Sequence, residues 1–383
     1  MMRGFALIGV LLVNLRFISS PQLYWNHADV TRRWPGFVHR ITEWFIQIFI
    51  VAKFLSLFSF MFGLGFALLM KRAVAKDAPF GLFYSRRLLA LLGFGLLHSF
   101  LLWYGDILTT YALLGFALVL FRRCSERSLL AWAAVLLLIP ALLTLAPSAG
   151  GSNAKTDSGE VAGAAALAEQ SIAAYRSSDF KQIFEQRVTD LTHAYQQTLP
   201  FLPLNFAMFL LGLYAGRRGV LQAIPEHLRL LRRLRNWGFT AGVAANAAAL
   251  AILREIVPAP SSIGVLAFTV GAPTLGLSYG ATLVILAQKP RHRRWLKPFA
   301  AVGRMALTNY MAQSAIATSL FYGYGLGLYA VWGPAADVPL AAMIFAAEMA
   351  FSVWWLRRYR FGPLEWIWRS LTYQRRQPFR IGS

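Results

Sequence analysis

The stretch LLALLGFGLLHSFLLWYGDILTTYALLGFALVLF, residues 88–121, decides the fold class of this chain. Two apolar runs flank a short turn, and Asp106 is its only Asp, Glu, Lys or Arg. A hydrocarbon core about 30 Å thick needs about 20 apolar residues per helix, so the stretch predicts two membrane helices joined by a tight external turn. The runs are continuous, whereas the strands of a membrane barrel alternate in polarity.

The composition agrees with a membrane protein. Of the 383 residues, 57% are hydrophobic and 14% are charged, against about 25% charged in soluble domains. The formal charge of +22 would suggest a nucleic-acid partner for a soluble protein, but in a membrane protein it marks cytoplasmic loops, and we expect no nucleic acid. The single cysteine, Cys124, excludes an intrachain disulfide and a cysteine cluster for zinc or iron–sulfur, and no metal site is predicted.

Ten runs of sufficient length predict an all-α, polytopic membrane helix bundle. The predicted spans are 2–18, 44–70, 88–105, 107–121, 129–146, 199–216, 237–253, 263–288, 301–321 and 338–356. With both termini in the cytoplasm, 26 of the 38 Lys and Arg fall in internal segments and seven in external ones. This asymmetry is the one that cytoplasmic loops show, and it sets the orientation.

We divide the chain into an N-terminal transmembrane bundle (1–146), an external connection (147–198) and a C-terminal transmembrane region with a basic tail (199–383). The connection begins as a Gly- and Ser-rich linker. After Ser178, apolar residues recur every three or four positions and predict an amphipathic surface helix. The first span could also be a signal peptide, but no A-x-A cleavage site follows it.

Ionisable residues inside spans are functional candidates, because a charge at bilayer depth costs several kcal/mol unless it is paired or hydrated. Lys53 and Glu348 are both predicted near the midplane and could form an ion pair that either fixes packing or serves a substrate or a proton. His98 is the only histidine within a span, which argues against a bis-histidine haem.

His98 is also a candidate general base, because histidine titrates in the physiological range. Asp106 could orient it, although eight residues on one straight helix span about 12 Å, so contact would require the chain to fold back at Gly105. Arg3 and Asn14 are eleven residues apart and share a helix face, as do Arg87 and His98. Each pair would place a cation at the cytoplasmic mouth and a polar group in the external half.

Several motifs resemble the YeiB family of bacterial inner-membrane proteins, a family long described as a domain of unknown function. They are MRGFALIGVLLVN (2–14), KFLSLFSFMFGLGFAL (53–68), RRLLALLGFGLLHSFLLWYGDILTTYALLG (86–115), GRMALTNYMAQS (303–314), FYGYGLGLY (321–329) and RFGPLEWIWRSLTYQRRQP (360–378). The resemblance implies a multi-pass protein of the bacterial cytoplasmic membrane. Members of that family usually have a few residues before the Arg-Gly pair, and their absence here suggests either a start upstream of Met1 or a truncated first helix.

The Arg3-to-Asn14 pattern is similar, more distantly, to that of heparan-alpha-glucosaminide N-acetyltransferases. This resemblance implies transfer of an acyl group from cytosolic acyl-CoA to a hydroxyl or amine. His27 then corresponds most nearly to that family's catalytic histidine. The predicted catalytic residues are His98, Asp106, Asn14 and His27. The predicted substrate-binding residues are Arg3, Arg86, Arg87, Lys53, Glu348, Asn309 and Gln313, with the basic cluster 291–294 as a further phosphate contact.

We therefore expect acyl-CoA as co-substrate, no tightly bound cofactor, and a sugar or lipid-linked acceptor at the external side of the membrane. The alternatives are a proton-coupled transporter of a small solute or lipid precursor, for which Lys53 and Glu348 would form the relay, and a non-catalytic membrane protein. The sequence leaves the acceptor, the acyl chain and the oligomeric state open.

Overall fold

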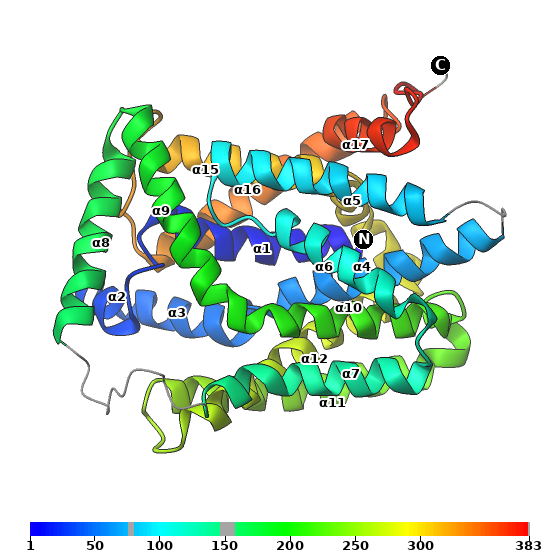
Figure 1. The fold of residues 1–383 in the computed structure, drawn as a ribbon, viewed down its shortest axis with the longest axis horizontal. Coiled ribbons are helices and arrows are strands. Elements are labelled where there is room, and N and C mark those ends of the chain that lie inside the picture. The colour runs from blue at the N-terminus through cyan, green and yellow to red at the C-terminus, as the bar shows by residue number, and fades with distance from the viewer. Residues whose placement is uncertain (76–79, 146–157, 382–383) are drawn as a thin grey trace.

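The computed structural model describes residues 1–75, 80–145 and 158–381, and within these ranges the chain is helical and contains no strand. Most helices run side by side along one direction (Figure 1). The principal ones are α1 (Met2–Ser19), α3 (Phe37–Phe49), α4 (Lys53–Val74), α5 (Phe80–Leu97), α6 (Leu108–Leu120), α7 (Glu126–Leu143), α10 (Leu202–Arg217), α11 (Ile224–Leu253), α12 (Ser261–Ala287), α15 (Ala306–Phe321) and α16 (Pro334–Trp355).

Eight helical segments of the described chain are long and apolar enough to cross a membrane, and they correspond to eight of the ten predicted spans. The other two predicted spans, 107–121 and 301–321, are helical but shorter. The first is α6, with 13 residues, and the second divides into α14 (Lys297–Arg304) and the 16-residue α15. An all-helical polytopic bundle is thus confirmed, and the count of ten crossings stays a prediction.

The predicted span 44–70 is not one helix. It breaks between α3 and α4, where Ala52 adopts a left-handed conformation with φ of 66°. The ammonium of Lys53 then donates a 2.7 Å hydrogen bond to the carbonyl of Gln47 in α3. A cation at the C-terminal end of a helix satisfies a carbonyl that has lost its own partner. The break therefore supplies Lys53 with a local backbone acceptor.

One short helix and two longer ones cover one end of the bundle. These are α2 (His27–Arg33), α8 (Ser158–Arg176) and α9 (Phe180–Thr198), which lie at the left of Figure 1, whereas both termini and α17 (Pro363–Tyr373) lie toward the right. Helix α9 lies where the amphipathic helix was predicted, and Asp179 is its N-cap. The sequence pattern did not predict α8, and most of the predicted linker, 146–157, lies outside the described residues.

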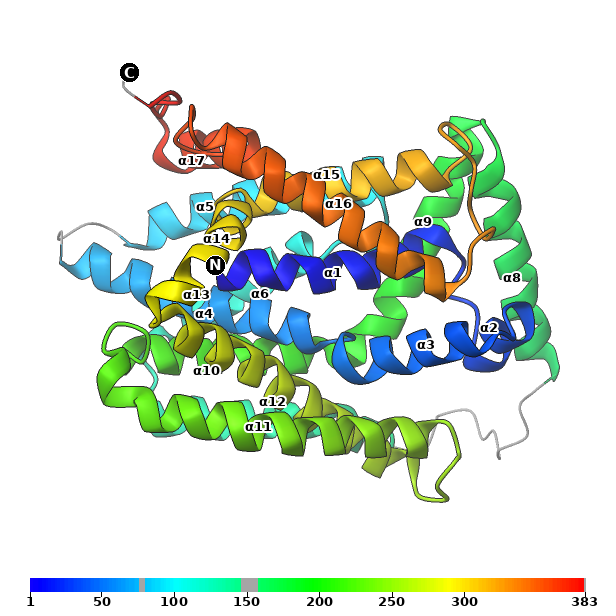
Figure 2. The same cartoon turned by 180° about the vertical axis from the view of Figure 1, so that it is seen from behind.

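Helix α1 lies in the middle of the bundle, as both ribbon views show (Figures 1 and 2). It packs against α4 and against three helices from the far end of the chain, α14, α15 and α16. The described structure thereby brings the N-terminal motif next to the GRMALTNYMAQS motif of α14 and α15.

Glycines bring the central helices into backbone contact. A Cβ atom at Gly63 of α4 would lie 1.9 Å from the carbonyl oxygen of Phe209, and one at Gly212 of α10 would lie 2.0 Å from that of Phe60. Helix α12 packs in the same way, because a Cβ atom at Gly276 would lie 2.4 Å from the carbonyl oxygen of Lys53. Small residues are what close helix packing in a membrane requires.

We predict that Gly212→Ala destabilises the protein by about 1–3 kcal/mol, because the added methyl group forces α4 and α10 apart. Gly93→Ala is the matched control, since nothing lies within 4 Å of a Cβ atom at that position. Thermal unfolding of the purified variants in detergent measures the difference. Equal unfolding temperatures for the two variants would contradict the close approach of these helices.

Candidate functional site

His98 lies where helix α5 changes its winding. Residues His98–Leu102 form a π-helical turn, in which the amide of Trp103 donates a 2.9 Å hydrogen bond to the carbonyl of His98. Single π turns inside α-helices occur frequently at functional sites. After Trp103 the chain runs non-helically to α6, so the short connection that the sequence predicted as a tight turn is an irregular segment, 103–107.

The chain folds back at this segment and brings Asp106 to His98. The Nδ1 atom of His98 lies 3.3 Å from Oδ1 of Asp106, and neither side chain is exposed. The other carboxylate oxygen, Oδ2, accepts a 2.7 Å hydrogen bond from the amide of Thr109 at the start of α6. A Cβ atom at Gly105 would lie 2.2 Å from the Trp103 ring, so the turn requires glycine there. The contact that the sequence left open is formed.

Helix α15 completes the surroundings of His98. Its Ser314 hydroxyl lies 2.8 Å from Nε2 of His98, and the Tyr310 ring packs on the imidazole with a centroid distance of 4.8 Å. The Tyr310 hydroxyl also donates a 3.4 Å hydrogen bond to the carbonyl of Gly105. Sequence reasoning missed Tyr310 and Ser314. Their spacing of four residues, which places both on one helix face, was the available signal.

A cavity of about 580 Å³ lies against this cluster. Its volume is within the range of sites for small ligands. Both interrupted backbone segments line it: Val51 and Ala52 at the α3–α4 break, and the segment 103–107 between α5 and α6. Asp106, Tyr310 and Asn14 also face it, whereas His98 and Ser314 lie behind Asp106 and Tyr310 and do not reach the cavity surface.

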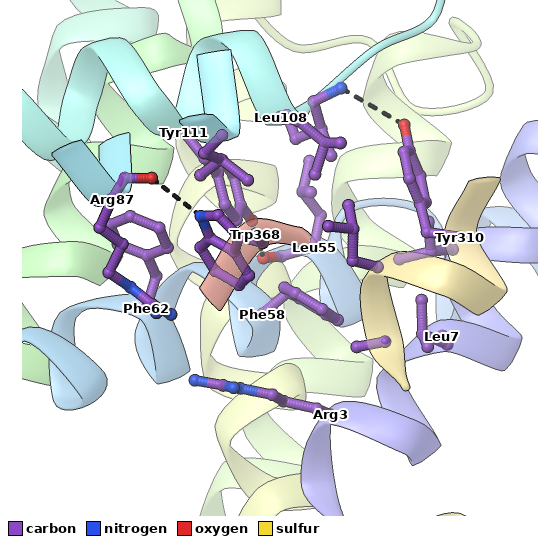
Figure 3. A pocket seen from close by; sticks show the side chains of 15 residues that line it. Arg3, Leu7, Leu55, Phe58, Phe62, Arg87, Leu108, Tyr111, Tyr310 and Trp368 are labelled. Atoms are coloured by element: carbon purple, nitrogen blue, oxygen red, sulfur yellow. Dashed lines mark hydrogen bonds between the residues drawn. The ribbon is translucent and has the colours of Figure 1, made fainter. Parts of the chain in front are cut away.

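A second cavity, of about 100 Å³, lies toward the end that holds the termini. Arg3 from α1 and Arg87 from α5 line it, and Figure 3 shows the Arg87 side chain beside Trp368 of α17, with the Arg3 side chain below them in the view. The Arg87 guanidinium lies 3.8 Å from the centroid of the Trp368 ring, and the indole N–H donates to the carbonyl of Arg87. Neither arginine forms an ion pair with a carboxylate of the described residues.

The two cavities are neighbours, because four residues line both of them: Val10, Leu55, Ile107 and Tyr310. The arginine-lined end, this apolar wall and the Asp106 cluster therefore follow one another through the bundle. The shared helix face predicted for Arg3 and Asn14 runs along this path, since Arg3 lines the smaller cavity and Asn14 the larger one.

Other predicted site residues lie elsewhere. Arg86 and His27 line neither cavity, and His27 is exposed on α2.

The predicted Lys53–Glu348 pair is not formed. Lys53 donates its hydrogen bond to the carbonyl of Gln47, and Glu348 accepts a 2.8 Å hydrogen bond from Gln313. Asn309 donates to Ser352 across the same α15–α16 interface. The basic cluster 291–294 belongs to α13 (Pro290–Trp295), outside both cavities.

A buried ionic cluster that the sequence did not predict joins three helices beside the larger cavity. Glu43 of α3 pairs with Arg16 of α1 and, at 3.6 Å, with Arg254 at the end of α11. Asp337 of α16 accepts a hydrogen bond from Ser19 nearby. These contacts fix α11 to the bundle, and each removed partner would leave a buried charge behind.

The apolar helices and the two cavities define a polytopic membrane protein with an internal site of ligand size. Residues 215–375 match the model of the family described as "Protein of unknown function (DUF418)". The chain is 40% identical to the uncharacterized protein YxaH of Bacillus subtilis, over 98% of this chain and 94% of that protein. It is 28% identical to the uncharacterized protein YeiB of Escherichia coli, over 98% of this chain and 96% of YeiB.

The chain belongs to the same family as YxaH, and its residues 215–375 carry the DUF418 match. The resemblance of its motifs to YeiB is thereby confirmed. No solved structure matches the chain.

We predict that Asp106→Ala lowers the stability by about 0.5–2 kcal/mol, because it removes the cap on the amide of Thr109. Asp106→Asn keeps an oxygen at this position and should unfold close to the wild-type temperature. Thermal unfolding in detergent compares the two. Equal destabilisation by both substitutions would show that the carboxylate charge, and not the cap, holds the turn.

Proposed function

We propose that this protein is an integral-membrane acyltransferase that moves an acyl group from acyl-CoA to an acceptor hydroxyl or amine. One observation carries the proposal: two adjoining cavities, with two arginines that pair with no carboxylate of the described residues at one end and an Asp106–His98 pair in the wall at the other. A two-substrate reaction needs two binding spaces that meet at the reacting atoms. The shared apolar wall around Tyr310 is that meeting point.

The smaller cavity suits the acyl-CoA. Arg3 and Arg87 have no carboxylate partner among the described residues, so their guanidinium groups are available for phosphate oxygens as charge-assisted donors. The apolar residues beyond them, such as Val10, Leu55 and Phe58, would surround the uncharged acyl end of the arm. The ring of Trp368 holds Arg87 in place by a cation–π contact.

The larger cavity suits the acceptor. The acceptor hydroxyl or amine would attack the thioester carbonyl, so that a C–O or C–N bond forms, the C–S bond breaks and the CoA thiol leaves. Asp106 belongs to the wall of the larger cavity and its carboxylate adjoins His98, so this pair would take the proton from the acceptor and return it to the thiolate. The amide of Asn14 would donate to the developing oxyanion.

The orientation follows from charge. Both termini lie toward the end that holds Arg3 and Arg87, and the basic internal loops belong to that end (Figure 1). We assign this end to the cytoplasm of a bacterial inner membrane, where acyl-CoA is available, and the covered end with α8 and α9 to the outside.

Transport is a second candidate, favoured by the helix breaks. The membrane helix formed by α3 and α4 is discontinuous beside the larger cavity, and discontinuous helices at a central site are common in secondary transporters. Lys53 at this break and Glu348 on α16 would then be the groups that bind or release a proton.

Acyl-CoA should raise the unfolding temperature of the purified protein, because a ligand that binds only the folded state stabilises it. Loss of a charge-assisted contact in Arg3→Gln or Arg87→Gln should weaken this protection roughly tenfold to hundredfold in apparent Kd. Arg86→Gln, one position outside the cavity lining, is the matched control. Acyl-CoA turnover should vanish in His98→Ala. No protection by any acyl-CoA would refute the proposal.

Reconstituted liposomes test the transport candidate. If the protein carries a substrate with protons, an imposed pH gradient drives uptake that Lys53→Met and Glu348→Gln abolish. Under the acyltransferase proposal, neither substitution affects proton flux, and the empty vesicles and the protein-containing vesicles acidify alike. Proton-coupled uptake that requires Lys53 or Glu348 would overturn the acyltransferase proposal.

A further inference from the structure

The polar side chains of the larger cavity are almost all uncharged. Asn14, Gln47, Asn205 and Asn246 line it, and among its described lining residues Asp106 is the only one with a charge. No Lys or Arg of the described lining faces this space, so a phosphate or carboxylate group would find no cation in it. Amides and hydroxyls are the groups that recognise sugar and polyol hydroxyls, as donors and acceptors at once.

One of these amides has an acceptor atom without a hydrogen-bond partner among the described residues. Asn246 of α11 is 3% exposed, and its Nδ2 atom donates a 2.7 Å hydrogen bond to the carbonyl of Gly242 in its own helix. Its Oδ1 atom has no partner among the described residues, although the side chain lines the cavity. Leaving such a buried acceptor unsatisfied costs about 1–3 kcal/mol, and a ligand hydroxyl would satisfy it.

The cavity reaches the molecular surface between two unlike edges. On one side, exposed residues at the end of α9 line it, including Tyr195, Gln197 and Thr198. On the other side, the lining includes Leu253, which is 46% exposed at the end of α11, and Val265 of α12. The opening thus has a polar edge and an apolar edge.

The outer end of the α11–α12 hairpin continues the apolar edge. Its exposed side chains are Leu253, Ile256, Val257, Ile263 and Leu266. Both helices are apolar enough to cross the membrane, and Ile256 and Val257 lie in the connection between them, so we infer that this end of the hairpin contacts lipid. An opening between such a surface and the polar end of α9 lies at the boundary between headgroups and acyl chains.

We propose that the acceptor is a glycolipid-like amphiphile, with an uncharged polyhydroxylated head in the larger cavity and a hydrocarbon chain that leaves between α9 and the α11–α12 hairpin into the bilayer. This inference rests on the proposed acyltransferase function and specifies its acceptor. The uncharged lining selects the head, the unpartnered Asn246 oxygen binds one of its hydroxyls, and the apolar edge accommodates the chain.

Binding can be measured without acyl-CoA, in lipid nanodiscs, with a long-chain alkyl glucoside that carries a photoreactive diazirine in its chain. We expect adducts on residues of the opening and of the outer α11–α12 hairpin. Unlabelled alkyl glucoside should compete, whereas free glucose and an alkyl phosphate of equal chain length should not. Competition by free glucose, or equal competition by the alkyl phosphate, would overturn the proposal.

Two pairs of variants make the test specific to the site. Asn246→Leu should reduce labelling about fivefold to tenfold, as expected for one lost hydrogen bond, and Asn236→Leu on the exposed face of α11 should not. Val265→Trp should block the opening, whereas Val270→Trp, exposed on the same helix but outside the cavity, should not. Unchanged labelling in Asn246→Leu and Val265→Trp would refute the inference.

The outcome is separable from that of the proposed function. Site-specific labelling without any acyl-CoA turnover would support the glycolipid site and refute acyl transfer. Turnover onto a soluble sugar without labelling would support acyl transfer and refute the glycolipid acceptor.

Discussion

The bilayer leaves no backbone polar group without a partner, and the rest of this structure depends on that constraint. Membrane helices satisfy it internally, so irregular backbone is tolerated only where protein or a cavity surrounds it. Two of the places where the described chain departs from regular helix, the α3–α4 break and residues 103–107, line the same cavity. Lys53 satisfies one end of the first break, and Asp106 caps the helix after the second.

Asp106 has two tasks in this arrangement. One carboxylate oxygen caps α6, and the other faces His98. The short helix α6 can therefore begin inside the bundle, which places the connection 103–107 against α15 and Tyr310. The hydrogen bond that makes the fold possible and the contact that suggests chemistry belong to one side chain. A carboxylate held in this way has a fixed direction, as a group that binds a substrate requires.

The sequence was sufficient for the helical bundle, because long apolar runs identify membrane helices without tertiary information. It also identified His98, Asp106, Arg3 and Asn14, which line or adjoin the two cavities. Depth along a helix, however, says nothing about the direction of a side chain. Lys53 and Glu348 were predicted at one depth, but the break beside Lys53 offered it a nearer acceptor. Tyr310 and Ser314 were missed because their role depends on which helix lies opposite.

The central place of α1 has a consequence for biosynthesis. This helix enters the membrane long before α14, α15 and α16, the helices that finally enclose it. During translation its buried Arg16 has Glu43 as an early partner, whereas the Asp337 region arrives only near the end. The early chain must therefore remain associated with the insertion machinery, or stay loosely packed, until the last helices emerge. Closure of both cavities is then one of the final events of assembly, and truncation near the C-terminus would remove the site while leaving most membrane helices intact.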